Sequence, residues 1–185
     1  MKKTIIILVA LISLINANAS DFFGLNWGDE AFYSINKLRL NYGNFSSYNS
    51  EENEIYYFEN DKMNIGGVEL DIISFSFTPF FGKYYLSSFS AFGEYHNSLL
   101  EALDDAKKIY KAMQYSHNLE EKDFKLEHLT EGGLVFVYRG EVNRSNGISA
   151  IFSILISHEN EDGINKYSVY CSGKTDDLTK FFSNK

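Results

Sequence analysis

The sequence predicts an α+β fold in which an antiparallel sheet has helices packed on one side. Two observations lead to this class. Two segments carry apolar residues at helical spacing, and each is followed by a group of segments in which apolar and polar residues alternate. Strands with one polar face need helices to cover the other face. The order of helix, strands, helix and strands is compatible with two α-β-β-β units in one sheet.

The first helix is predicted over residues 29–42. We expect Gly28 to be its N-cap, with Trp27 and Phe32 in the two positions of a hydrophobic staple. Gly43 follows the last periodic residue and is expected to end the helix in a left-handed conformation. The apolar residues that share one face at spacings of three or four are Phe32, Ile35, Leu38 and Tyr42.

The first group of strands is predicted at residues 54–59, 68–77 and 84–92, with loop over residues 44–53. In the middle segment the phase of the alternation changes. Val68, Leu70 and Ile72 share one phase, and Ile73, Phe75 and Phe77 share the other. Either a bulge lies near Ile72-Ile73, or both faces of this strand are covered.

The segment from Glu94 to Tyr115 predicts a long amphipathic helix. Ser98 and Glu101 have the spacing of a capping box and indicate where it begins. Its apolar stripe consists of Tyr95, Leu99, Leu103, Ala106, Tyr110 and Met113.

The last third of the chain predicts an antiparallel meander. Its strands are expected at residues 134–141, 148–156 and 164–171, joined by turns at Asn146-Gly147 and Asp162-Gly163. Residues 175–182 are compatible with a short terminal helix or with a frayed tail.

The first nineteen residues predict a signal peptide. Lys2 and Lys3 precede an uncharged apolar run over residues 4–15, which is too short to span a bilayer. Ala17 and Ala19 supply the small side chains of a cleavage site, so the mature protein is expected to begin at Ser20. We therefore expect residues 20–185 to form a single domain that is periplasmic or secreted. No cysteine adjoins the cleavage site and no second apolar run follows, so neither a lipid anchor nor an integral membrane segment is expected.

The composition argues against several classes of partner. The formal net charge is −8, and the predicted signal peptide carries two lysines and no acid, so the mature chain is more acidic still. This balance disfavours nucleic acid and anionic lipid surfaces. Cys171 is the single cysteine, so no internal disulfide can form, and its alternating context predicts a buried thiol.

The sequence contains no recognisable catalytic, metal-binding or cofactor-binding motif. The four histidines stand singly in different predicted elements, and neither a G-x-S-x-G turn nor a phosphate-binding loop occurs. Glu94 and His96 would share a face as an acid–base pair if they lay in a strand, and would be separated if they opened the helix. Surface positions are the favoured interpretation for both.

The segment Phe23 to Gly43 (FGLNWGDEAFYSINKLRLNYG) resembles the opening of many small exported bacterial proteins. It is similar in outline to β-lactamase-inhibitor-protein-like modules and to the small lipoproteins of outer-membrane assembly. The resemblance implies a protein-binding function. The chain has Trp27-Gly28-Asp29 at the turn and lacks the lipidated cysteine of the assembly lipoproteins.

These observations favour an exported protein-interaction or inhibitory module of the bacterial cell envelope, without catalysis and without a cofactor. Its partner would be another envelope protein. The candidate binding surfaces are the loop that carries Phe22, Phe23 and Trp27, and the solvated face of the meander. One alternative is a small-ligand carrier whose cavity would be lined by aromatic residues; a small hydrolase is a further, less favoured one. The candidate wall residues of the carrier are Tyr56, Phe58, Phe75, Phe77 and Phe152.

Overall fold

The computed structural model describes residues 23–49, 53–59, 63–117, 128–129, 134–143 and 149–175, together with Leu178 and Phe182. Its helices are α2 (Ala31–Tyr42) and α3 (Leu99–His117). Its strands are β1 (Ser46–Asn49), β2 (Glu54–Glu59), β3 (Asn64–Ile65), β4 (Val68–Phe80), β5 (Lys83–His96), β6 (His128–Leu129), β7 (Leu134–Asn143), β8 (Ser149–Glu161) and β9 (Ile164–Lys174).

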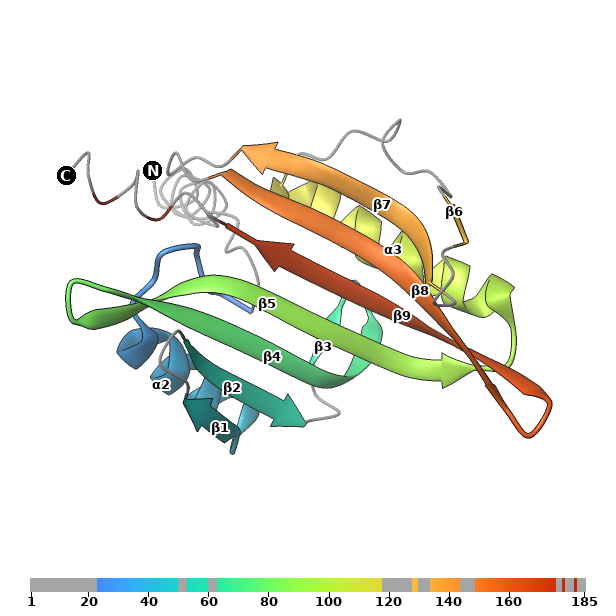
Figure 1. Ribbon diagram of the computed structural model, residues 1–185, viewed down its shortest axis with the longest axis horizontal. Coiled ribbons are helices and arrows are strands. Elements are labelled where there is room, and N and C mark those ends of the chain that lie inside the picture. The colour runs from blue at the N-terminus through green and yellow to red at the C-terminus, as the bar shows by residue number, and fades with distance from the viewer. Residues whose placement is uncertain are drawn as a thin grey trace, which may run out of the picture.

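The strands form one antiparallel sheet in the order β1-β2-β4-β5-β9-β8-β7-β6, and β3 pairs with β4 (Figure 1). Each half of this order is a meander that follows its own helix: α2 precedes β1, β2, β4 and β5, and α3 precedes β6 to β9. The two meanders join where their last strands, β5 and β9, pair. The predicted α+β class is confirmed, with four strands rather than three along the path of each unit.

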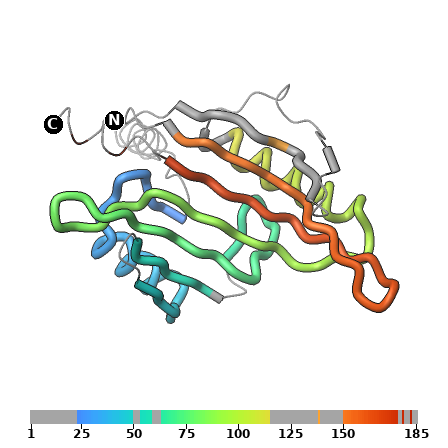
Figure 2. Tube along the Cα trace, viewed as in Figure 1, coloured from blue at the N-terminus to red at the C-terminus, as the bar shows by residue number. Residues whose placement is uncertain are grey.

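Both helices lie on the same side of the sheet, behind the strands in Figures 1 and 2. Helix α2 contacts β5, and α3 contacts β9, β8, β5 and β7. We call the side that the helices cover the inner face and the opposite side the outer face. Neither of these helices lies over the outer face. The described residues Leu178 and Phe182 contact one corner of it: Leu178 lines a hollow with Ser76 and Ser88, and the Phe182 ring lies 5.0 Å from Phe80 and 4.4 Å from Tyr85, between ring centroids.

An aromatic row across the inner face forms the centre of the core. In register, Phe75 of β4 lies opposite Phe89 of β5, and Phe89 and Phe152 of β8 lie on either side of Gly173 of β9. The Trp27 ring packs over this row at 6.1 Å from Phe89 and 6.2 Å from Phe152, between ring centroids. A Cβ on Gly173 would lie 2.5 Å from Phe89, so glycine lets the rings approach the strand directly.

Helix α2 differs from its prediction in its capped end and its buried face. The residue at its N-cap is Glu30, not Gly28, and its side chain makes no capping hydrogen bond. The buried positions are Ala31, Ser34, Ile35 and Leu38, whereas Phe32 is 68% exposed. Trp27 is buried in the core whereas Phe32 is exposed, so the staple between Trp27 and Phe32 does not form. The predicted end at Gly43 is confirmed, because its amide donates to the Arg39 carbonyl, but its φ of 91° and ψ of −144° differ from the expected left-handed helical conformation.

Helix α3 begins where the capping signal placed it. The amide of Leu100 donates to Oγ of Ser98 at 3.2 Å. Its buried residues are Ala102, Ala106, Ile109, Tyr110 and Met113. Tyr95 was predicted at the start of this stripe, but it lies in β5 and is half exposed because the strand continues to His96.

The phase change in β4 is a bulge. The register shifts between Leu70 and Ile72, so that Leu70 and Ile73 both point inward while Ile72 points outward. The turn at Asp162-Gly163 is also confirmed, with positive φ at both residues. The Asn146-Gly147 turn lies outside the described residues, and so does most of the segment 175–182. Strands β1, β3 and β6 were not expected from the sequence.

Candidate functional site

A row of serines crosses the outer face at the junction of the two meanders. Ser74 of β4 lies opposite Ser90 of β5, Ser90 opposite Ser172 of β9, and Ser172 opposite Ser153 of β8. The hydroxyl oxygens of Ser74 and Ser90 are 2.7 Å apart and share a hydrogen bond. All four side chains are half-buried. Because these residues lie in paired strands, the hydrogen bonds between the strands hold the backbone that carries the four hydroxyl groups in place.

An apolar row lies beside the serines, one step along the strands. It consists of Ile72, Phe92, Tyr170 and Leu155, which are paired in the same manner across β4, β5, β9 and β8. The rings of Phe92 and Tyr170 are 4.6 Å apart between centroids. Ile72 and Phe92 are each 42% exposed. These two side chains point outward because they continue the alternation of Ser74 in β4 and of Ser90 in β5, and each strand changes register only beyond them.

The third row borders a hollow of about 470 Å³ on the other side of the serines. Ser76, Ser88 and Lys174 form this row, with Ile151 at its end. The hydroxyl groups of Thr78 and Ser87 are 2.8 Å apart, and Ser87 donates to the Ser76 carbonyl at 3.1 Å. Lys174 is the only charged residue in the three rows, which we call together the outer patch.

One corner beyond the outer patch is acidic. The Tyr95 hydroxyl donates to Glu159 at 2.9 Å, and Asp71 and Glu161 lie close enough to act on it electrostatically. The hydrogen bond to Glu159, followed by burial and by these carboxylates, raises the pKa of the Tyr95 phenol. Lys166 pairs with Glu161 and offsets part of this charge. The patch thus has an uncharged centre, a negative corner beside Tyr95, and Lys174 on the opposite side next to the hollow.

The loop predicted as a binding surface contributes instead to the core. Trp27 is 2% exposed. The Phe23 ring is half-buried and makes edge contacts with Tyr42 at 5.7 Å and Phe75 at 5.9 Å. Trp27 is therefore not exposed at the surface, whereas Phe23 keeps part of its surface accessible. Phe22 and the predicted cleavage residues Ala17, Ala19 and Ser20 lie outside the described residues.

His96 lies in a strand, yet its acidic partners come from α3 and not from Glu94. Its Nε2 is 2.8 Å from Oδ2 of Asp105, and its Nδ1 is 4.0 Å from Oε2 of Glu101. These contacts link the end of β5 to the first turns of α3. His158 stacks on Tyr167 at 4.9 Å and contacts Asn165. The pairing of His96 with Asp105 could not be found from sequence spacing, because it depends on how α3 packs on the sheet.

The residues proposed to line a carrier cavity pack on one another. Phe58, Phe75, Phe77 and Phe152 are fully buried, and the Tyr56 ring contacts Phe77 at 5.6 Å. Cys171 is also fully buried, and burial raises the pKa of its thiol to about 12. These side chains are part of the core.

Three further findings bear on function. Within the described residues, no group of three or more His, Cys, Asp and Glu side chains is arranged to hold a metal ion. The described helices include none that combines the length and the apolar character needed to cross a membrane. Comparison with family models, with curated proteins and with solved structures found no match. The resemblance of Phe23 to Gly43 to exported protein-binding modules therefore stays a prediction.

Proposed function

We propose that this chain is an exported protein-binding module that engages another protein of the cell envelope through the outer patch. The observation that carries the proposal is the register that aligns hydroxyl and aromatic side chains across four strands on a face that neither α2 nor α3 covers. Export rests on the sequence of Met1 to Ala19.

The composition of the patch supports a protein partner. The centres of protein interfaces are depleted in charge and enriched in aromatic residues, with a polar rim. Binding loops of antibodies combine tyrosine with serine for the same physical reason: rigid rings supply area, and hydroxyl groups adapt as donors or acceptors. Tyr170, Phe92 and the serine row provide this combination on a scaffold whose backbone is already ordered.

The size of the outer face is also sufficient. Strands β4, β5, β9, β8 and β7 have 13, 14, 11, 13 and 10 residues. With about 3.4 Å per residue and about 4.8 Å between strands, they present a surface of about 19 Å by 40 Å. A standard interface buries about 800 Å² on each partner. The area of these five strands is therefore about that of a standard interface, and the outer strands β1, β2 and β6 are not needed.

The partner should carry a neutral centre and a basic region at the one corner where the outer patch is negative. The corner formed by Asp71, Glu159 and Glu161 is negative, and the whole chain has a formal net charge of −8. Complementary charge at the rim increases the association rate and orients the partner. The occupant of the outer patch is therefore a protein with a surface that is basic where it meets this corner.

Site-specific photocrosslinking tests the proposal. The full chain is expressed in cells of its source organism with benzoylphenylalanine in place of Phe92, or in place of Leu40 as a control. Leu40 is 86% exposed on α2, away from the outer face. A saturable crosslink to a basic protein from position 92, absent from position 40, is the expected result.

A second pair of variants separates binding from folding. S90R places a bulky charge at the centre of the patch, and L40R places the same charge on the opposite side. We expect S90R to abolish the crosslink from position 92 while L40R preserves it, with unchanged circular dichroism in both. Equal crosslinking from both positions, or none from position 92, would overturn the proposal.

A further inference from the structure

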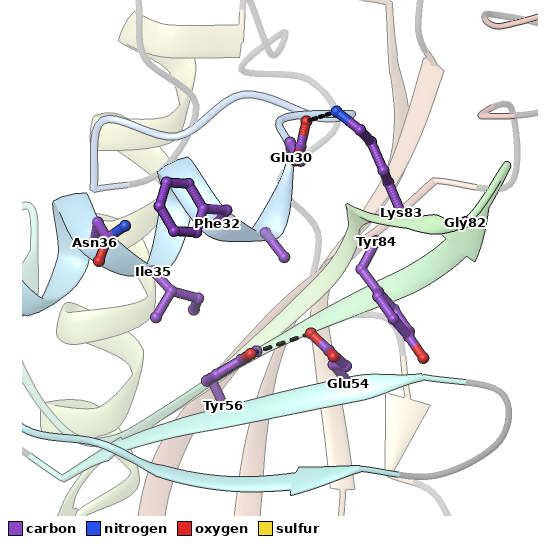
Figure 3. Close-up of a pocket in the computed structure, with 10 residues that line it drawn as sticks. Glu30, Phe32, Ile35, Asn36, Glu54, Tyr56, Gly82, Lys83 and Tyr84 are labelled. Carbon is purple, nitrogen blue, oxygen red and sulfur yellow. Dashed lines mark hydrogen bonds and ion pairs between the residues drawn. The ribbon is translucent and has the colours of Figure 1, made fainter.

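A groove of about 340 Å³ lies on the helix side of the sheet, between α2 and strands β2 and β5 (Figure 3). It is separate from the outer patch, because Tyr56 lies opposite the inward-facing Phe75. Its volume falls at the small end of ligand-binding pockets. The residues that matter for its chemistry are Phe32, Tyr56, Tyr84, Glu30, Lys83 and Glu54.

Aromatic rings from three elements line the groove. Phe32 comes from α2, Tyr56 from β2 and Tyr84 from β5, and Figure 3 shows them around the same space. Phe32 is 68% exposed although it lies next to the buried Ala31. Its ring contacts Tyr33 at 5.6 Å and not the core. The position of Phe32 is thus open to a ligand in the groove.

The charges in the groove leave a negative excess at Glu54. Lys83 and Glu30 form an ion pair at 2.7 Å at the rim, so their charges offset each other. The Tyr56 hydroxyl donates to Oε2 of Glu54 at 3.1 Å. Burial, followed by the contact with Glu54, raises the pKa of the Tyr56 phenol, which keeps it a neutral donor. Figure 3 shows the Glu54 carboxylate between the Tyr56 and Tyr84 side chains.

We propose that this groove binds a small organic cation of the ammonium class, with Glu54 as its counter-ion and the rings of Phe32, Tyr56 and Tyr84 around its apolar substituents. The physical reason is that aromatic faces attract alkylammonium groups, whose charge is spread and weakly hydrated. The Glu54 carboxylate beside the rings attracts a cation electrostatically, and a neutral ligand of the same shape lacks this attraction. An anion would be repelled by Glu54, since Lys83 is already neutralised by Glu30.

Choline provides a direct probe, because its carbon isostere dimethylbutanol has the same shape and no charge. Binding of each to the full chain is measured by NMR titration. We expect saturable binding of choline and binding at least about fivefold weaker for dimethylbutanol. Equal binding of both would show only an apolar groove, and binding of neither would show no site; each result overturns the proposal.

Two substitutions assign the site. Glu54→Gln keeps an acceptor for Tyr56 and removes the charge, and Phe32→Ala removes an exposed ring. We expect each to weaken choline binding by about two- to fivefold.

The matched controls are Glu101→Gln and Phe81→Ala, since Glu101 is exposed on α3 and Phe81 is 87% exposed. These controls should leave binding unchanged. Unchanged binding in Glu54→Gln would overturn the role of the counter-ion, and Phe32→Leu provides a second ring variant if Phe32→Ala alters the fold.

Discussion

Gly173→Ala is expected to destabilise the protein by acting on the aromatic row of the core. The added Cβ would lie 2.5 Å from Cε1 of Phe89, 2.9 Å from Cε1 of Phe152 and 3.0 Å from Cζ2 of Trp27. Because carbon atoms pack best at 3.5 to 4.0 Å, the Phe89 ring must move by about 1 Å. All three contacts are with aromatic rings of the core, which have little room to move.

The expected loss follows from two opposing effects. Overpacking of a core costs about 1–3 kcal/mol. Replacing glycine by alanine in a strand also stabilises the protein by about 0.5–1 kcal/mol, because the unfolded chain then has less conformational entropy to lose. Because the closest contact would be 2.5 Å, the cost lies in the upper part of its range, and we expect the free energy of unfolding to fall by about 1–2.5 kcal/mol.

Urea denaturation followed by tryptophan fluorescence measures this change at the site itself, because Trp27 is the only tryptophan in the chain. Ser172→Ala, one residue away on the outer face, is the matched control and should change stability by less than about 0.5 kcal/mol. In a Phe89→Leu background the cost of Gly173→Ala should be smaller, with a coupling energy of about 1 kcal/mol. A Gly173→Ala protein as stable as the parent, with unchanged fluorescence, would refute the packing argument.

Three other predictions concern single side chains. Ser98→Ala removes the acceptor for the Leu100 amide and should lower the free energy of unfolding by about 1 kcal/mol, measured by urea denaturation; no change would mean that water replaces the cap. Cys171 should resist thiol reagents at pH 8 in the folded protein and react once urea unfolds it, because burial raises its pKa to about 12. Glu159→Gln should lower the pKa of Tyr95, seen by NMR of labelled tyrosine. Because the pKa of Tyr95 is raised in the folded protein, its phenol contributes stability below the ordinary pKa of tyrosine, and this stability is lost as the pH rises through the raised pKa. An unchanged Tyr95 pKa in Glu159→Gln would contradict the role of Glu159.

Helix α3 and strand β4 show what the sequence could predict. Periodicity located α3, and Ser98 marked its first turn. Of the predicted stripe, Ala106, Tyr110 and Met113 are buried, whereas Leu99 is 36% exposed and the buried Ala102 and Ile109 were not expected. The bulge in β4 was visible because a change of phase between Leu70 and Ile73 cannot occur in a regular strand that buries one face. In both elements the spacing of apolar residues along the sequence agrees with the face that is buried in the fold.

Helix α2 shows why the other predictions failed. It contacts β5 and buries the side formed by Ala31, Ser34, Ile35 and Leu38, so the predicted Ile35 and Leu38 face the core whereas Phe32 does not. Periodicity identifies apolar positions, but it does not say how much of a helix the sheet can cover. Trp27, from the loop before the helix, packs on Phe89 and Phe152 and not on Phe32.

The outer patch could not have been found before the register was known. Ser74, Ser90, Ser153 and Ser172 are far apart in the sequence, and only the pairing of β4, β5, β9 and β8 aligns them. The groove has the same origin, since Phe32, Glu54 and Tyr84 come from three elements. Side chains that meet through long-range pairing leave no signature in local spacing.

The pairing of β5 with β9 also determines the order in which the fold can be completed. It joins Ser88 to Lys174 and His96 to Tyr167, so the contacts at the middle of the sheet are among the most distant along the chain. Such non-local pairing is slow to form, because a long loop must close first. Until β9 arrives, the β5 backbone has an open edge that is prone to aggregation. During synthesis from the N-terminus, β5 would therefore have to be kept apart from other chains until β9 has been made.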